Sequence, residues 1–562
     1  MLNGKLRICL LLEGMTLPSW AVRMIELMDQ GDYAEIVLVV HEALPEAMQL
    51  VASSGEVAAG PDAANSWHTA VRRLGAVALR MLVGKRGHLP DAFAPVDATK
   101  RLASVATIEL GIRSRISSDG IEDDDLAAIR SHDIDVLIQL GCGNTGAGIA
   151  GGARHGVWSC GVGDAGAGRS EFDCFWEVME SRPEIGSTLE IVTSDSRGTI
   201  VAYRSFSSTD VMSLADTRNI VQWKSLHFIP RMLKQLHEEG AHAFFARLQH
   251  AAFQPRSYDR RQNTVPTILE LGVLLWKKGL QKFERKWNDV FYFNQWFLLY
   301  DMQNDLSTSL WKFIHITPPK DRFWADPFVV VRDSRYYIFI EECPYATRKG
   351  HISFIELNKD GTFEPPVRVI DASYHLSYPF IFEFEGDLYM IPESGANRTV
   401  DLYKCTAFPR KWEFQKHLRA DLHAVDTTLF EWQGRWWMFA NEVETRGASS
   451  WDELFLYYSD NPLSGSWTPH PKNPIVSDVR SARPAGRLFM RNGRIYRPSQ
   501  NCAGHYGYGF NICEVTKMTE TEYEEVVMER IEPKWDKNIV STHTLNYENG
   551  LTVIDGQLRR RR

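Results

Sequence analysis

The chain has 562 residues, of which 44% are hydrophobic and 11% aromatic, and its formal net charge is −8 at pH 7. This length predicts several domains, and the negative charge gives no reason to expect nucleic-acid binding. The 8 cysteines are scattered and form no Cys-x-x-Cys pair. We therefore expect reduced thiols, with neither a disulfide framework nor a metal site.

The first apolar segment of the chain is short. Residues Leu6–Leu12 are mostly apolar, but the run ends at Glu13 and lacks a small-residue cleavage site, so it predicts a strand and not a signal peptide. No run approaches the roughly 18 apolar residues that a membrane span needs. We expect a soluble, cytoplasmic protein.

Residues 1–210 predict a doubly wound α/β domain. Leu6–Leu12 and Ala34–Val40 read as buried strands on either side of a helix at Pro18–Met28. A helix at Asp124–Ser131 then precedes another buried strand, Asp133–Leu140. Such alternation implies right-handed crossovers and a parallel sheet. Between the strand at Ala34–Val40 and the helix at Asp124–Ser131, we expect another helix through residues 67–80.

A glycine-rich loop, Gly141–Gly148, follows the last of these strands. Ligands on open sheets bind beyond the carboxyl ends of strands, so a site would lie here. The loop lacks the Gly-x-x-x-x-Gly-Lys phosphate signature, and no dinucleotide fingerprint follows the first strand. Tight turns and a working cofactor loop remain the two interpretations. No cofactor-binding residue is assigned, and the cofactor stays unknown.

This domain resembles the formyltransferase family, which implies a sheet that binds formyl-tetrahydrofolate. The carrying residues are Trp20, Asp135–Gly143, Gly156–Asp164, Phe175–Val178 and Pro183–Leu189. The family uses an Asn-x-His pair, but Ser159 and Gly161 stand at those positions here. Without the imidazole, no general acid/base remains for the amine proton. The resemblance thus implies a degenerate, non-catalytic domain.

Residues 211–290 predict a helical connector. Val221–Glu239, Ala241–Ala252 and Thr267–Trp287 show amphipathic spacing, and the last contains several lysines. A basic amphipathic helix can lie on an anionic membrane surface, whereas the other interpretation is a helix that packs between domains. The Arg559–Arg562 tail also allows two interpretations, contact with acidic lipid or phosphate and a solvated end.

Residues 291–562 contain a repeated pattern of aromatic and β-branched strands. Its starts lie 52, 48, 57 and 60 residues apart, at Asp326, Tyr378, Asp426, Arg483 and His543. This period predicts a β-propeller. The last repeat supplies only two strands, so we expect residues 293–317 to complete a fifth blade and close the ring.

In a propeller the innermost strands direct their first residues at the central channel, so the five repeat starts predict a polar cluster. The next strand of each blade adds Glu341 or Glu342, Glu393, Asn441, Gln500 and Asp555. Burying so many polar groups without partners would cost several kcal/mol each. We therefore interpret the cluster as a ligand site and not as turn capping. Trp324, Tyr378 and Tyr506 are candidates for stacking on sugars.

This half resembles the propeller part of the plant glucosamine inositolphosphorylceramide transferases. The carrying residues are Trp324–Phe328, Tyr378–Phe380, Pro392–Glu393, Asn473–Ile475, Arg483–Gly486 and Arg497–Gln500. It also resembles, more distantly, the arabinanase, levansucrase and invertase clan. That clan uses an Asp from the first blade, an Asp from the third and a Glu acid from the fourth. Asp326 and Asp426 match the first two, but Arg483 stands in the fourth blade.

The missing acid argues against simple hydrolysis, which needs two carboxyl groups across the bond. We expect Asp326 to act as base or nucleophile, Asp426 to orient the sugar, and Glu341, Glu393 or His543 to donate the proton. Arg483 would clamp an anion such as a sugar phosphate, and Gln500 would bind substrate.

Three functions follow as hypotheses. The first is a carbohydrate-active enzyme of glycan or glycolipid assembly, a glycosyltransferase or glycoside-processing enzyme whose partner is a sugar, sugar phosphate or glycolipid. The second is a non-catalytic glycan-binding scaffold. The third is N-formylation of an amino sugar by the first domain. The oligomeric state is open.

Overall fold

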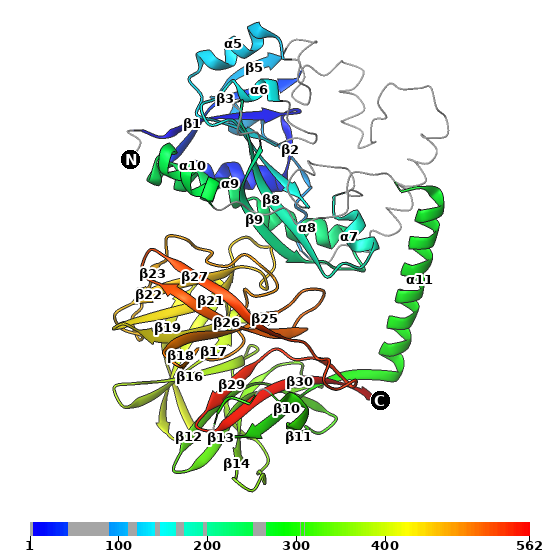
Figure 1. Cartoon of the computed structure of the whole chain (residues 1–562), viewed down its shortest axis with the longest axis vertical. Helices are drawn as coiled ribbons and strands as arrows, with labels where there is room; N and C mark the ends of the chain where they lie inside the picture. Colours follow the sequence, from blue (N-terminus) through cyan, green and yellow to red (C-terminus); the bar gives the residue numbers. More distant parts are fainter. Residues whose placement is uncertain are drawn as a thin grey trace. The chain divides into compact units, whose positions relative to one another are not determined.

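A computed structural model describes residues 4–42, 89–110, 121–140, 147–163, 173–194, 199–250, 266–303, 305–307 and 309–562 (Figure 1). The chain divides into two compact units. The first comprises Met1–Ser205, Thr209–Gly279 and Thr445–Ala448, and the second Phe206–Ser208, Leu280–Glu444 and Ser449–Arg562. The helix expected at residues 67–80 and the loop at residues 141–146 lie outside the described residues.

The first unit is built on a seven-stranded mixed sheet in the order β5-β3-β1-β6-β7-β8-β9. Its first five strands pair in parallel and β8 is antiparallel to β7. The parallel part has the strand order typical of doubly wound sheets. The strands are β1 (Leu6–Leu12), β3 (Ala34–Glu42), β5 (Ala106–Leu110), β6 (Val136–Gln139), β7 (Val157–Val162), β8 (Glu184–Val192) and β9 (Thr199–Ser208), and a separate ribbon pairs β2 (Thr16–Pro18) with β4 (Pro95–Asp97).

The sheet is buried on both faces. Leu6, Ile8 and Leu10 of β1 belong to one core cluster, and Cys9 and Leu11 belong to another. Alternating residues of a strand point to opposite faces, so a continuous apolar run fits a central strand with helices on both sides. The predicted α/β architecture agrees with this sheet, while its likeness to formyltransferases stays a prediction.

Eight helices of the first half have the following bounds: α1 (Ser19–Asp29), α4 (Thr99–Leu102), α5 (Asp123–Ser131), α6 (Ala147–Ala150), α7 (Phe175–Met179), α8 (Leu214–Ser225), α9 (Phe228–Glu239) and α10 (Ala241–His250). The single helix expected over Val221–Glu239 is two helices, α8 and α9. Pro230 explains the break, because proline lacks an N–H and is tolerated in the first turn of a helix but not in its interior. A new helix therefore begins just before it.

Helix α11 (Ile268–Phe291) is the longest described helix. Thr267 and Glu270 form a capping box at its start, since the Glu270 amide donates to Thr267 Oγ1 and the Thr267 amide donates to Glu270 Oε2. Among the described helices, none is both long and apolar enough to cross a bilayer.

The second unit is a five-bladed propeller, as predicted. Four blades have consecutive strands: β12 (Arg322–Arg332), β13 (Arg335–Pro344), β14 (His351–Leu357) and β15 (Val367–Ile370); β16 (Ser377–Phe384), β17 (Asp387–Ser394), β18 (Thr399–Ala407) and β19 (Lys411–Ala420); β20 (His423–Trp432), β21 (Arg435–Val443), β22 (Leu454–Ser459) and β23 (Thr468–Pro469); β24 (Phe489–Arg491), β25 (Arg494–Asn501), β26 (Gly509–Met518) and β27 (Tyr523–Ile531).

The fifth blade joins the two ends of the propeller sequence. β10 (Tyr292–Met302) pairs on one side with β11 (Ile314–Ile316) and on the other with β30 (Leu551–Arg561), which also pairs with β28 (Ile539–Ser541) and β29 (Leu545–Glu548). The pairing of β10 with β30 runs from Tyr292↔Arg561 to Met302↔Leu551. This confirms the predicted ring closure, in which strands before the first repeat complete the last blade.

The fourth blade differs from the expectation that a strand begins at Arg483. Pro484 makes only an isolated bridge to Ser499, and the regular strand β24 begins at Phe489. Pro484 cannot donate a ladder hydrogen bond, and Gly486 has a φ of +135°. These two residues keep the segment irregular.

Candidate functional site

The innermost strands of the first three blades carry the same distortion. Asp326, Tyr378 and Asp426 have φ values of 52°, 43° and 52°. The pairing register shifts at each of these positions. Left-handed backbone is uncommon for residues other than glycine, and bulges often re-aim a side chain next to a site. The shared distortion therefore places three repeat starts in equivalent positions at the channel.

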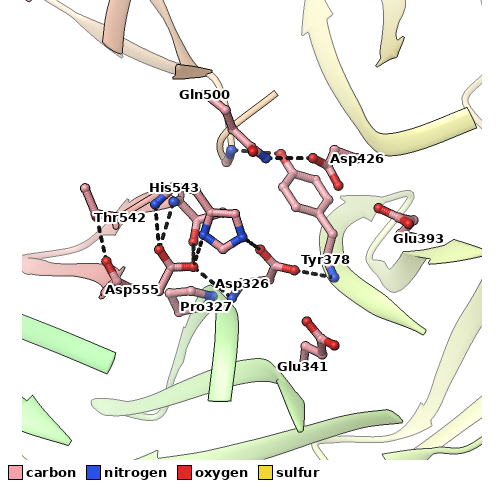
Figure 2. Close-up of polar contacts among 12 residues, drawn as sticks. Asp326, Pro327, Glu341, Tyr378, Glu393, Asp426, Gln500, Thr542, His543 and Asp555 are labelled. Carbon is pink, nitrogen blue, oxygen red and sulfur yellow. Dashed lines mark hydrogen bonds and ion pairs between the residues drawn. The ribbon is translucent and has the colours of Figure 1, made fainter. Parts of the chain in front are cut away.

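Asp326 belongs to a buried network with His543 and Asp555 (Figure 2). His543 Nε2 lies 3.3 Å from Asp326 Oδ1, and His543 Nδ1 lies 2.6 Å from Asp555 Oδ2. The Thr544 hydroxyl and the amides of His543 and Thr544 also donate to Asp555. The imidazole thus lies between two carboxyl groups from different strands.

Burial and charge act against each other in this network. Burial raises the pKa of Asp326 to about 8, although His543 opposes the shift. Burial disfavours the charged form of His543, but Asp555 and Asp326 outweigh it and raise the His543 pKa to about 9. Burial also disfavours the Asp555 carboxylate, yet His543 and the Thr544 hydroxyl together lower the pKa of Asp555. Asp326 and His543 are therefore poised to hold a proton near neutral pH.

A second network surrounds Asp426. Arg483 Nε lies 2.5 Å from Asp426 Oδ2, and Arg483 Nη2 lies 3.2 Å from Asp426 Oδ1. Gln500 Nε2 also donates to Asp426, over 2.8 Å. Arg483 Nη2 reaches Glu393 Oε2 at 3.3 Å. The Arg483 charge is therefore already engaged by two acidic groups, which differs from a free clamp for an anionic substrate.

Glu393 is the acidic group of this second network that solvent can reach. Its side chain is 17% exposed, whereas that of Asp426 is 2% exposed. Burial, and next the charge of Asp426, raise the pKa of Glu393 well above its usual value, and Arg483 opposes them only in part. Burial and a neighbouring carboxyl group thus favour the protonated form of Glu393, while Asp426 makes the shorter contact with Arg483.

Aromatic residues enclose both networks. Trp296 stacks on the His543 ring at 4.3 Å, and Tyr506 lies against the same ring at 5.3 Å. The Arg483 guanidinium lies over the Tyr506 ring at 4.8 Å. The fully buried Tyr378 hydroxyl bonds to Thr428 Oγ1 and accepts from the Gly486 amide. Tyr506 thus borders both networks, whereas Tyr378 ties three blades together.

Two of the predicted residues form their polar contacts with residues outside these networks. Glu341 is buried and pairs with His375, whose Nε2 lies 3.1 Å from Glu341 Oε1. Figure 2 draws Glu341 close to Asp326 but with no bond to it. Trp324 lies in a core cluster between blades, and its indole faces Glu342 Oε1 at 3.4 Å. Glu342 itself is held by Arg322, His351 and Ser353, so of the two aligned glutamates only Glu341 faces Asp326.

Sequence reasoning missed Trp296, Thr428 and His375. Trp296 is on β10, which closes the ring, and a repeat alignment that starts at Asp326 does not include this strand. Its signal would have been a Trp that directly follows two polar residues, Asn294 and Gln295, near the start of the predicted closing segment. His375 precedes the second repeat start by three residues and carries no repeat signal of its own.

Two groups in the described residues bring together side chains that metals use as ligands. They are Asp326, His543 and Asp555, and Glu341, Cys343 and His375. In the first, each imidazole nitrogen already faces a carboxylate. In the second, burial raises the pKa of Cys343 to about 12, which disfavours the thiolate that binds metals. The chemistry of both donor sets therefore favours proton sharing over metal binding.

Comparison with known proteins gives relatives for the propeller. A family model described as "Glucosamine inositolphosphorylceramide transferase 1, N-terminal" matches residues 315–548. Glucosamine inositolphosphorylceramide transferase 1 of Oryza sativa subsp. japonica is 38% identical over 207 residues, covering 36% of this chain and 28% of that protein. The Arabidopsis thaliana protein of the same name is 36% identical over 208 residues, covering 36% and 27%. The chain thus spans less than a third of these relatives.

Solved structures similar to this chain are glycoside hydrolases. The catalytic domain of Coprinopsis cinerea GH62 α-L-arabinofuranosidase has 11% sequence identity and a TM-score of 0.34, covering 43% of this chain and 94% of that one. A GH43 β-1,3-galactosidase has 11% identity and a TM-score of 0.32, covering 46% and 94%. These matches confirm the resemblance seen in the sequence: the propeller, which holds both buried networks, is similar to the N-terminal region of the glucosamine inositolphosphorylceramide transferases.

Proposed function

We propose that the propeller is a carbohydrate-active enzyme of glycan or glycolipid assembly that transfers or modifies a sugar at the channel. The observation that carries this proposal is the pair of buried carboxyl groups with raised pKa values, Asp326 and Glu393, each beside a cationic partner. Sites that move protons at neutral pH need carboxyl groups tuned in this way.

Glu393 is the best proton donor in this site. Burial and the charge of Asp426 raise its pKa and so favour its protonated form, and its side chain is 17% exposed, against 2% for Asp426. On giving the proton to the oxygen of a leaving group, Glu393 becomes negative. Arg483, 3.3 Å away, would then stabilise the new carboxylate. In this proposal Glu393 takes the role of the acid whose fourth-blade position Arg483 occupies.

Asp326 is the matching base or nucleophile. The proton shared within its network can lie on His543, because Asp555 stabilises the imidazolium from the other side. Asp326 is then a carboxylate that can accept a proton from an acceptor hydroxyl, and a base with a raised pKa is well matched to work near pH 7. Trp296 and Tyr506 hold the imidazole in place.

The substrate class in this proposal comes from the relatives. Their name joins a sugar, glucosamine, and a lipid, inositolphosphorylceramide, with the word transferase. The related propeller here would accept a sugar, sugar phosphate or glycolipid headgroup. Asp426 and Gln500 are buried and joined by a hydrogen bond, so they would act on the sugar through Arg483, which Asp426 holds beside Glu393.

A non-catalytic glycan-binding scaffold is the second candidate, and one observation favours it. Asp555 accepts the Asp326 amide at 3.2 Å, and Asp326 accepts the Tyr378 amide at 3.2 Å. Each carboxylate thus links its own blade to the next, a role that needs no turnover. A variant that keeps these hydrogen bonds but cannot transfer a proton should keep its fold under both roles, and it should lose turnover only if the role is catalytic.

The test uses the full chain and a panel of nucleotide sugars and aryl glycosides, with soluble and lipid-borne acceptors. Wild type, Glu393→Gln and Asp326→Asn are compared with Glu383→Gln, an exposed glutamate of the same blade as Glu393. We expect turnover with at least one donor, a loss of about a hundredfold or more in both site variants, and no loss in the control. Sugar binding on a glycan array with no turnover by any form would establish the scaffold instead.

A further inference from the structure

Helix α11 carries a stripe of apolar side chains that point to solvent. Its residues recur every three or four positions, which places them on one face of the helix; they are Val273, Trp276, Leu280, Phe283, Trp287 and Val290. The exposed fraction is 70% for Trp276, 63% for Phe283 and 54% for Trp287. Large aromatic residues this exposed on a single helix face mark an interaction surface.

The stripe is not the face by which the helix packs. Leu271, Leu274 and Leu275 pack against a core cluster of the first unit. Lys278 is buried on the same side, where it donates to Ser181 Oγ and to the Val211 carbonyl, both at 2.9 Å. The apolar stripe is therefore a second apolar face on a helix whose first apolar face is already covered.

Basic side chains, together with one acidic side chain, Glu284, border the stripe. At about 100° per residue, Lys277 and Lys286 lie on its two sides, and Lys282 and Arg285 lie on the polar face. All four side chains are exposed. A helix with Trp, Phe and Leu on one face and Lys or Arg along its borders is the type that lies in a membrane interface.

The C-terminal arginines lie at the end of the same stripe. The Arg562 amide donates to the Phe291 carbonyl at 3.1 Å, and Arg562 Nε donates to the Tyr292 carbonyl at 3.4 Å. The register of β30 against β10 also pairs Arg561 with Tyr292. Arg559, Arg561 and Arg562 are exposed. Figure 1 shows the C-terminus beside the end of α11, so strand pairing fixes three exposed arginines next to exposed Phe291 and Tyr292.

We propose that the stripe of α11, together with Arg559–Arg562, docks on a membrane surface containing anionic phospholipid. The aromatic and leucine side chains would enter the interface, and the lysines and arginines would contact phosphate groups. A second copy of the chain fits less well, because the basic borders and tail would face their own like charges. This inference goes beyond the proposed function and does not depend on turnover, although it would hold the propeller at the surface that carries glycolipids.

The experiment is co-sedimentation of the full chain with vesicles of phosphatidylcholine alone or with phosphatidylglycerol added. One variant, Phe283→Ala/Trp287→Ala, shortens the stripe, and its control is Trp311→Ala, an equally exposed Trp of the propeller. A second variant, Lys286→Gln/Arg561→Gln/Arg562→Gln, removes three charges. Its matched control is Lys359→Gln/Lys416→Gln/Lys472→Gln, three exposed lysines away from the helix.

We expect wild type to bind the anionic vesicles at least about tenfold more strongly than neutral ones, and binding to weaken as salt is raised. The stripe variant and the charge variant should each bind the anionic vesicles about tenfold or more weakly than wild type, and neither control should bind more than about twofold more weakly. Absence of binding by wild type, or equal losses in variants and controls, would overturn the proposal. So would a wild-type dimer that Phe283→Ala/Trp287→Ala converts to monomer without any vesicle binding.

Discussion

The ion pair between Arg483 and Asp426 gives the most direct test of the buried site. We consider Arg483→Gln, which removes the guanidinium contacts at 2.5 and 3.2 Å to Asp426 and the contact at 3.3 Å to Glu393. Gln500 would remain bonded to Asp426. The change leaves a carboxylate that is 2% exposed without its cation.

The expected magnitude follows from that burial. Removing one partner of a buried ion pair costs about 3–5 kcal/mol, because the remaining charge cannot be rehydrated. The comparison is an exposed pair whose arginine lies in the same blade, Arg491 with Asp305, since its side chains are 43% and 63% exposed. Arg491→Gln should cost no more than about 1 kcal/mol. In the double variant Arg483→Gln/Asp426→Asn, about half of the lost stability should return, because no buried charge remains unpaired.

The assay is amide hydrogen exchange of the full chain, read by mass spectrometry on peptides from β20 and β25, which report the opening free energy of the propeller itself. The reasoning is refuted if Arg483→Gln and Arg491→Gln lower that free energy equally. It is also refuted if the double variant is less stable than Arg483→Gln, since the penalty would then not come from the orphaned Asp426 charge.

Three further predictions follow. The folded state raises the pKa of Asp326 from 3.8 to about 8 and that of His543 from 6.5 to about 9, so the native state binds extra protons. The free energy of unfolding should therefore fall as pH rises toward 9, by up to about 1.4 kcal/mol per pH unit for each proton. Denaturation measured from pH 6.5 to 9 should show a smaller fall in Asp326→Asn, and an unchanged pH dependence of that free energy would contradict the shift. Gly486→Ala should lower stability by about 3 kcal/mol or more, since a Cβ would lie 2.0 Å from the Leu545 carbonyl oxygen. Gly434→Ala, at a positive φ but in open space, should lower it by only about 1 kcal/mol. Equal unfolding midpoints of the two variants in urea would contradict the close contact between Gly486 and Leu545. If Glu393 donates its proton, turnover should fall as pH rises above its pKa, and Glu393→Gln should remove this alkaline limb; a limb that persists in the variant would assign the proton to another group.

The repeat positions could be predicted because each blade begins with a strand of the same apolar pattern, and these strands recur at a nearly constant spacing along the chain. Asp326, Tyr378 and Asp426 head strands of like pattern, and the structure aligns them with one distortion in common. What the pattern could not predict is the direction of the neighbouring side chains. In a regular strand Trp324 would share a face with Asp326, but the bulge after Ala325 turns the two apart, and Trp324 lies in the core.

The partners of the charged residues were also beyond sequence reasoning. Arg483 was expected to bind an anionic ligand, yet it is engaged by Asp426 and Glu393, which are 57 and 90 residues away in the chain. Such pairings depend on which blades are neighbours and on rotamers, and spacing alone specifies neither. The same limit explains why Glu341, Glu393 and His543 could not be ranked as proton donors until their exposure was known.

The closing blade has a consequence for how the protein reaches its folded state. Its contacts join residues that are 270 positions apart in the sequence, and such long-range pairing must wait until the four intervening blades exist. His543 and Asp555 follow those blades, so the proton-sharing network with Asp326 assembles in the same late event that joins the ends. During synthesis, the Asp326 network therefore forms only when the ring is complete, whereas the contacts of Arg483 with Asp426 and Glu393 join blades that are made earlier.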